Sequence, residues 1–154
     1  MAVGLIEATD EMYNVVEVAW AKACLDALEM IEPGELIFDV ISVDMQSQAD
    51  AKTTVWARVA KQTTAGDRRA IGGRLWRNAG LLQVQVLVPM KPYGRAAGTI
   101  AETLAGIVLG VIRGHANGAV EFTTAFASPV GFEGTAYRFD VTSEFSFYTA
   151  SEEA

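Results

Sequence analysis

The chain has 154 residues, of which 51% are hydrophobic and 20% are charged. This composition excludes an intrinsically disordered chain, and the length fits one globular domain over residues 1–154, with an acidic tail that we expect to fray near 150–154. The net charge of -7 and the pI of 4.7 argue against a dedicated nucleic-acid-binding domain, for which a pI above about 9 is typical.

The sequence shows no feature of a membrane or secreted protein. The start, MAVGLIEATDEMYN, lacks the positive segment and apolar core of a secretory signal. The most apolar run, LAGIVLGVI, is about half of the ~20 residues that cross a membrane. The single cysteine, Cys24, provides no disulfide framework and suits a reducing compartment. We therefore expect a soluble intracellular domain with no membrane contact.

Charge is divided unevenly along the chain. Residues 1–50 carry eleven acids and one base, residues 51–100 carry one acid and nine bases, and residues 101–154 carry seven acids and two bases. The three segments therefore have net charges of -10, +8 and -5. This segregation suits a subunit whose one face meets a different face of its neighbour, and it equally suits a set of solvated faces.

The first half of the chain predicts a helix and then strands. Thr9 and Asp10 can cap an amphipathic helix that ends at Pro33-Gly34. Residues 36–44 are ambiguous between an extra strand and a buried loop. Alternation predicts a strand over 53–64, followed by a turn over 65–73 and a second strand over 74–89 that bends near 78–80.

The second half predicts a helix and two further strands. Pro89 closes the preceding strand, and a helix follows that begins near Arg95 or at a capping box formed by Thr99 and Glu102. Its apolar side comprises Ala97, Ile100, Ala101, Leu104, Val108 and Val111. Extended segments cover 118–130 and 135–149. The fold class is therefore α+β: a mainly antiparallel sheet of four to five strands with two helices packed on one face.

Few residues are equipped for chemistry. The only histidine, His115, follows the second helix in a glycine-rich turn, and Cys24 lies on an amphipathic helix where a small buried hydrophobe is the usual role. We expect no enzyme activity, no cofactor and no metal site. Gly106, Gly110 and Gly114 share one helical side, which indicates close approach of another backbone or tight packing on the chain's own sheet.

The basic segment is the candidate functional region. Its candidate residues are Trp56, Arg58, Arg68, Arg69, Arg74, Trp76 and Arg77. Aromatic and arginine side chains of this kind stack on nucleic-acid bases, and they are also favoured at the centres of protein interfaces. We favour a subunit interface, because the acidic N-terminal region can receive a basic partner, and we keep a nucleic-acid-binding module as the alternative.

The order of five segments resembles that of a known family. VWARV (Val55 to Val59), RRAIGG (Arg68 to Gly73), GLLQVQVLVP (Gly80 to Pro89) with Gly94, and IAETLAGIV are followed by YRFDVTSEFSFY (Tyr137 to Tyr148). Together they are similar to the tail terminator proteins of long-tailed, non-contractile bacteriophages. The resemblance covers roughly residues 53–149 and, less clearly, the N-terminal helix.

The resemblance implies a structural protein of the virion, assembled in the host bacterial cytoplasm. Copies of such a subunit form a hexameric ring in the neck, which caps the head-proximal end of the tail tube, stops its polymerisation and joins the tail to the head connector. The implied partners are other copies of the chain, the tail tube protein and the connector or head-completion protein, with transient contact to passing DNA. The family has no catalytic residues. Another neck, head-completion or tail tube protein is the nearest alternative.

Overall fold

The computed structural model describes residues 3–38, 53–68 and 75–150. In chain order the elements are α1 (Leu5–Leu28), β1 (Leu36–Ile37), β2 (Trp56–Arg68), β3 (Leu75–Pro89), α3 (Met90–Tyr93), the 3-10 helix η1 (Gly94–Ala96), α4 (Ala97–Arg113), β4 (Glu121–Glu133) and β5 (Ala136–Ala150). The strands form one sheet in the order β1-β2-β3-β5-β4. Only β1 runs parallel to its neighbour, and the other pairs are antiparallel.

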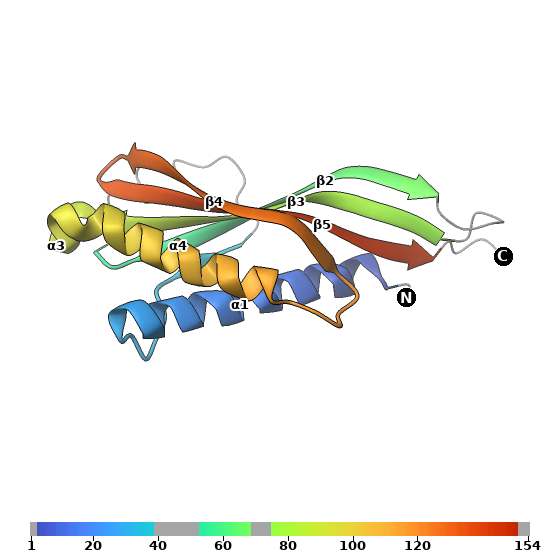
Figure 1. Ribbon diagram of the computed structural model, residues 1–154, viewed down its shortest axis with the longest axis horizontal. Helices are drawn as coiled ribbons and strands as arrows, with labels where there is room; N and C mark the ends of the chain where they lie inside the picture. Colours follow the sequence, from blue (N-terminus) through green and yellow to red (C-terminus); the bar gives the residue numbers. More distant parts are fainter. Residues whose placement is uncertain (1–2, 39–52, 69–74, 151–154) are drawn as a thin grey trace.

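The two long helices cover the same face of this sheet. Figure 1 shows α1 and α4 lying along one side of the strands, so the molecule has two layers. The predicted α+β class, with a mainly antiparallel sheet and two helices on one face, is confirmed. The ambiguous segment 36–44 contains the short strand β1 at Leu36–Ile37, and its remainder from residue 39 lies outside the described residues.

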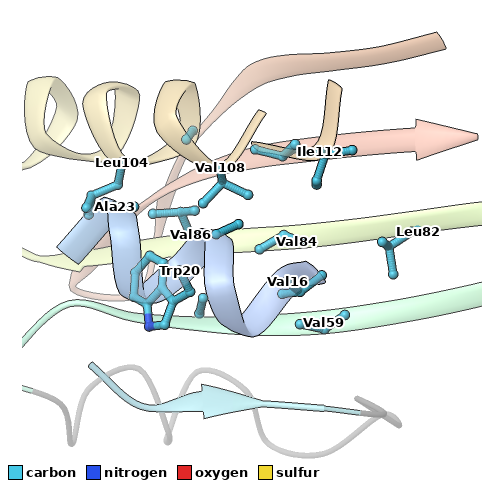
Figure 2. Packing of buried hydrophobic residues seen from close by; sticks show 14 of the residues in the cluster. Val16, Trp20, Ala23, Val59, Leu82, Val84, Val86, Leu104, Val108 and Ile112 are labelled. Carbon is cyan, nitrogen blue, oxygen red and sulfur yellow. The ribbon is translucent and has the colours of Figure 1, made fainter. Parts of the chain in front are cut away.

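The core lies between the helices and the sheet (Figure 2). From α1 come Val16 and Trp20, while α4 contributes Leu104, Val108 and Ile112. The strands contribute alternate residues, because successive side chains of a strand point to opposite faces. These are Val59 of β2, Leu82, Val84, Val86 and Val88 of β3, and Val141, Phe145 and Phe147 of β5. The strand residues between them therefore lie on the other face of the sheet, which we call the outer face.

Close packing requires glycine at position 80. The ladder between β2 and β3 shifts register after Thr63, which leaves an extra residue on β2 opposite Ala79 and Gly80. A Cβ added at Gly80 would overlap the carbonyl oxygen of Gln62 and would lie 2.7 Å from Cζ of Phe145. The predicted bend near residues 78–80 therefore coincides with a β-bulge covered by an aromatic ring.

Both long helices begin earlier than their expected capping residues. Helix α1 starts at Leu5, after Gly4, so Thr9 lies inside it and donates its hydroxyl hydrogen to the carbonyl of Leu5 at 3.1 Å. Helix α4 starts at Ala97, which places Thr99 within its first turn. Its buried residues are Ala97, Ala101, Leu104, Ala105, Val108 and Ile112. Ala105 and Ile112 thus replace Ile100 and Val111 of the predicted apolar side, which are only half-buried.

The stretch Met90–Arg113 is long and apolar enough to be a candidate membrane span by composition, with a mean hydropathy of 1.5. Its backbone is not one continuous helix, because Lys91 has non-helical angles and Gly94 has a positive φ of 60°. The continuous part, α4, has 17 residues, and its most apolar side packs on the sheet. We therefore interpret this stretch as a core helix.

Two glycine substitutions test this packing in opposite directions. Gly80→Ala places a methyl group against Phe145 and the β2 backbone, and we expect the free energy of unfolding to fall by about 1–3 kcal/mol. Gly106→Ala lies on the exposed side of α4, where an added Cβ meets no atom within 4 Å. It should raise the free energy of unfolding by about 0.5–1 kcal/mol. Denaturant unfolding of both variants measures these changes, and equal effects would contradict the packing.

Candidate subunit interface

The outer face of the sheet carries a connected polar network at the end nearest the β4–β5 turn. Nε of Arg58 donates to Oε1 of Gln85 on the adjacent strand, and the two terminal nitrogens of Arg58 lie 2.8 Å from the two carboxylate oxygens of Glu133. Arg138 bridges Glu133 at 3.1 Å and binds both oxygens of Asp140 at 2.7 and 2.8 Å. The end of β4 therefore lies over this face, since β3 and β5 separate the strands of Arg58 and Glu133.

Trp56 and Arg58 are held inside the subunit by these contacts. Trp56 has 0% exposure and packs with Leu87, Ala136 and Ile37 on the outer face. Arg58 has 2% exposure, and its guanidinium carbon lies 5.6 Å from the centre of the Trp56 ring. In this structure both residues stabilise the sheet, so they present no surface to a neighbour. The alternation that predicts this strand could not indicate that both side chains are buried.

The ionisation of Glu133 and Arg138 is set by the charged side chains that contact them. Hydrogen bonds from Arg58 are the largest influence on Glu133, and with Arg138 they hold the pKa of its carboxyl below the ordinary value despite partial burial. The bonds to Asp140 raise the pKa of Arg138. Glu133 therefore remains a carboxylate between two guanidinium groups, and it links the β4–β5 hairpin to the centre of the sheet.

Three further candidate residues, Arg68, Trp76 and Arg77, lie in the strands at the other end of the sheet. We call residues 62–68 of β2, 75–81 of β3 and 144–150 of β5 the arm, and Figure 1 shows the tips of these strands reaching past the start of α1. Arg68 pairs with Trp76 across the β2–β3 ladder. Arg77 is half-buried, and it forms no ion pair within the described part of the chain. Arg69 and Arg74 lie outside the described residues.

Arg77 lies on the outer face of the arm with two exposed apolar neighbours. The side chains of Leu82, Val84 and Val86 face the helices, so alternation along β3 places Arg77 and Leu81 on the opposite side. Tyr148 is the register partner of Arg77 on β5. Leu81 and Tyr148 are 39% and 36% exposed. Glu144, the register partner of Leu81, is also exposed, so this patch combines a cation and an acid with exposed apolar surface.

A groove with acidic character lies on the helical side of the molecule, between α1 and the end of α4. It has a volume of about 740 Å³. Its carboxylates are Glu7, Asp10 and Glu11, and its apolar lining includes Val15, Val18 and Val111. Val18 is 63% exposed. We call this feature the acidic groove; sequence analysis placed acids on the first helix and did not predict a groove.

Glu11 at the edge of this groove fixes the segment after α4. Its carboxylate accepts hydrogen bonds from the backbone N–H groups of Ala119 at 2.9 Å and Val120 at 2.8 Å. Nε2 of His115 lies 2.9 Å from the same carboxylate and donates to it, because an ionised carboxylate only accepts. A Cβ at Gly118 would overlap Oε2 of Glu11, so a larger residue there would displace the carboxylate from these contacts. His115 thus has a structural partner 104 residues away in the sequence.

These contacts also set the ionisation of Glu11. Burial raises the pKa of its carboxyl, but the hydrogen bonds from His115, Val120 and Ala119 outweigh burial and bring the pKa below the ordinary value of 4.5. Cys24, the other residue considered for chemistry, is buried, and burial raises the pKa of its thiol. A buried thiol of this kind behaves as a small hydrophobe.

The glycines of α4 do not pack against the sheet. At Gly106 and Gly110 an added Cβ would meet no atom within 4 Å, and both residues are exposed. The interpretation that they allow tight packing on the chain's own sheet is therefore wrong. They leave a smooth side of α4 that continues from the acidic groove, which Gly114 lines.

The outer strand β4 is a poor partner for an added strand. It contains Pro129 and two register irregularities, one after Thr123 and one after Pro129. Bulges and proline at a sheet edge disrupt the row of backbone groups that another strand would bind. Phe126, Val130 and Phe132 are nevertheless exposed on it. This edge thus offers side chains to a partner more readily than backbone.

Comparison with known proteins leaves the assignment open. No family model matches the chain, and no curated protein matches it. One solved structure shares 17% sequence identity and aligns over 88% of this chain and 94% of its own with a TM-score of 0.44. A similarity of this size carries no functional argument. Within the described residues, no group of three or more His, Cys, Asp or Glu is arranged to hold a metal ion.

Replacing Glu133 by glutamine tests the outer-face network. The substitution keeps the size of the side chain but leaves buried Arg58 without its counter-charge. At neutral pH we expect the free energy of unfolding to fall by about 2–3 kcal/mol. Glu121→Gln, at an exposed position of the same strand, is the control and should change little. Chemical denaturation of the wild type and of both variants measures the free energies of unfolding. Equal values for the wild type and Glu133→Gln would contradict the network.

The contacts of Glu11 with His115, Ala119 and Val120, which we call the Glu11 clamp, predict a specific response to acid. Because the folded-state pKa lies below 4.5, the stabilisation is complete above that pH and is lost as the pH falls from there through the folded-state pKa. Glu11→Gln should lower the free energy of unfolding by about 1–2 kcal/mol at neutral pH, and the difference should shrink in acid. Thermal unfolding across pH measures this. A difference that is constant with pH, or one matched by exposed Glu17→Gln, would contradict the clamp.

Proposed function

We propose that this chain is a structural subunit of a bacteriophage virion, a tail terminator. Copies of it form a ring that caps the head-proximal end of the tail tube, stops tube polymerisation and joins the tail to the head connector. The proposal rests on the resemblance of five segments of the sequence to that family, and on one property of the subunit's surface. In this proposal the chain has no catalytic activity and needs no cofactor.

The observation that carries the proposal is that the two sides of the subunit expose unlike surfaces. One side shows the outer face of the arm, with Arg77, its register partner Tyr148, and Leu81 further along the same strand. The other shows the helices, with the acidic groove and the smooth side of α4. A cyclic ring requires contacts in which one patch meets a different patch on the next copy. A subunit with different surfaces on opposite sides meets that requirement.

The irregular edge strand β4 favours association of subunits through their sheet and helix faces, without pairing of strands between subunits. Pro129 and the irregular register disfavour an extended sheet that continues from one subunit to the next. Face-to-face packing repeats one rotation at each contact, and a ring closes when that rotation divides a full turn evenly without a shift along the axis. The exposed residues Phe126, Val130 and Phe132 then remain for the other proteins of the tail and neck.

The structure weakens the nucleic-acid alternative. Base stacking requires accessible aromatic and arginine side chains, but Trp56 and Arg58 are buried. Asp10 and Glu7, which are exposed, further disfavour an approaching phosphate backbone on the helical side. Transient contact of DNA with the remaining arginines of the arm is compatible with a ring through which DNA passes.

Electron microscopy of the purified chain tests the proposal, with and without the tail tube subunits of the same virion. We expect single rings of uniform diameter, and we expect added rings to shorten tubes and to lie at one tube end. A tube protein would instead stack into long cylinders, and an unrelated neck protein would leave tube growth unchanged. Either outcome would replace the tail terminator assignment.

A further inference from the structure

We propose that the edge strand β4 carries a latent surface for pairing with a second copy of this chain, and that Arg113 keeps this surface closed. Nε and Nη2 of Arg113, the last residue of α4, both donate to the carbonyl oxygen of Ala125, at 3.2 and 2.6 Å. A carbonyl that already accepts two N–H groups has no lone pair left for an entering strand. This role does not depend on the proposed ring, because it concerns a contact that the subunit avoids in any assembly.

The register of the whole sheet sets the direction of the backbone groups of β4. Ala57 of β2 donates its N–H to the carbonyl of Glu35, next to β1, so Ala57 directs its N–H and C=O away from β3. Residues opposite each other in an antiparallel ladder either both direct these groups to each other or both direct them away. Val86, the partner of Ala57, therefore directs its groups to β5. Every second residue along β3 does the same, including Val84 and Leu82.

This alternation places three residues of β4 at the free edge of the sheet. The β5 partners of Val86, Val84 and Leu82 bond to β3, so they direct no N–H or C=O toward β4. The residues opposite them on β4 are Pro129, Ala127 and Ala125. Their backbone groups therefore point out of the sheet, where no further strand follows among the described elements.

A contact of the N-terminal segment agrees with this alternation. Arg77 lies an odd number of residues from Val86, so it bonds to β2, and its partner Tyr148 directs its backbone groups away from β3. The carbonyl of Tyr148 accepts the N–H of Val3 at 2.8 Å. Beyond the start of β4 at Glu121, the chain itself thus occupies this edge of β5.

Ala125 and Ala127 flank Phe126, which defines the geometry of the latent pairing. A second β4, placed antiparallel about a two-fold axis at Phe126, would set Ala125 of each copy opposite Ala127 of the other. Both residues direct N–H and C=O outward, so each pair would exchange both of its backbone hydrogen bonds. Phe126 is 48% exposed on the outer face and would meet its own copy there. The same patch serves both copies, as a two-fold contact requires.

Arg113 closes this surface at one of its two acceptors. While the guanidinium holds Ala125, one hydrogen bond of each pair cannot form, and a cation lies where the second strand would enter. The stretch that remains regular is short, because the register shifts after Thr123 and again after Pro129, which has no N–H. Occupation of one carbonyl is therefore enough to close it.

Removal of Arg113 beside a reporter cysteine tests the closed edge. Phe126→Cys places a thiol on the proposed axis, where opposite Cα atoms lie about 4.5 Å apart, within disulfide range. With oxidised glutathione as the oxidant, Arg113→Ala/Phe126→Cys should form a disulfide-linked dimer about tenfold faster than Phe126→Cys alone, in proportion to the paired population. Gel electrophoresis without reductant measures this rate. The native Cys24 is buried and adds no background.

Matched variants control for position and for charge. Arg113→Ala/Thr123→Cys has its thiol at an exposed position of β4 away from the axis, and it should cross-link no faster than Thr123→Cys alone. Arg95→Ala/Phe126→Cys removes an exposed cation of η1 and should behave as Phe126→Cys does. Circular dichroism verifies folding. If Arg113→Ala does not fold, Arg113→Gln replaces it, because its shorter side chain cannot place two donors on this carbonyl.

Sedimentation velocity tests the pairing without an added thiol. Arg113→Ala should raise the self-association constant about tenfold or more above that of the wild type. Ala127→Pro in the same chain removes an outward N–H that the pairing needs and no bond to β5, so it should cancel the gain. Hydrogen exchange gives a second measurement, since the amide of Ala127 should become protected only in the associated Arg113→Ala chain.

Three results would overturn the proposal. Equal cross-linking of Phe126→Cys with and without Arg113 would show that Arg113 does not close the edge. Equal cross-linking at Thr123 and at Phe126 would show association in another register. An Arg113→Ala chain that associates no more than the wild type would show that the surface does not exist. None of these results decides whether the wild-type chain forms a ring, which electron microscopy tests separately.

Discussion

The structure depends on the burial of one face of a long sheet beneath two helices. Alternate residues of β2, β3 and β5 meet α1 and α4, and almost all of the apolar core lies in that single layer. Burial of a large aliphatic or aromatic side chain contributes roughly 1.5–3 kcal/mol, so this layer dominates the stability. The chain has no third layer of helices among the described residues, and the outer face must therefore be stabilised or used in another way.

The two ends of the outer face meet this constraint differently. At one end the β4–β5 hairpin lies over Trp56 and Arg58, and Glu133 supplies the charge that a buried guanidinium requires. A buried ion pair is stable only when further hydrogen bonds surround it, and Gln85 and Arg138 each supply one here. At the other end, in the arm, no helix and no hairpin covers the described strands. That end is the one available to a partner.

The fold class and the strand alternation could be predicted because they depend on neighbouring residues. The register of Val84 and Val86 follows from a period of two, and Pro89 ends its strand as expected. The start of the first helix was wrong, because packing of Ala8 extends α1 to Leu5 and overrides the preference of Thr9 for a cap. The second helix begins at Ala97, close to the predicted start near Arg95. Contacts between distant residues left no local signal. Glu11 with His115, and Arg58 with Glu133, join positions 104 and 75 residues apart.

The uneven distribution of charge affects the orientation of subunit contacts more than their strength. An exposed ion pair contributes only about 0–1 kcal/mol, so the acids of α1 and the arginines of the arm cannot by themselves hold subunits together. They can decide which of several apolar contacts is made, because like charges brought together oppose every other orientation. The segregation of charge along the sequence thus suits a contact between unlike patches, which is the kind of contact that a closed ring requires.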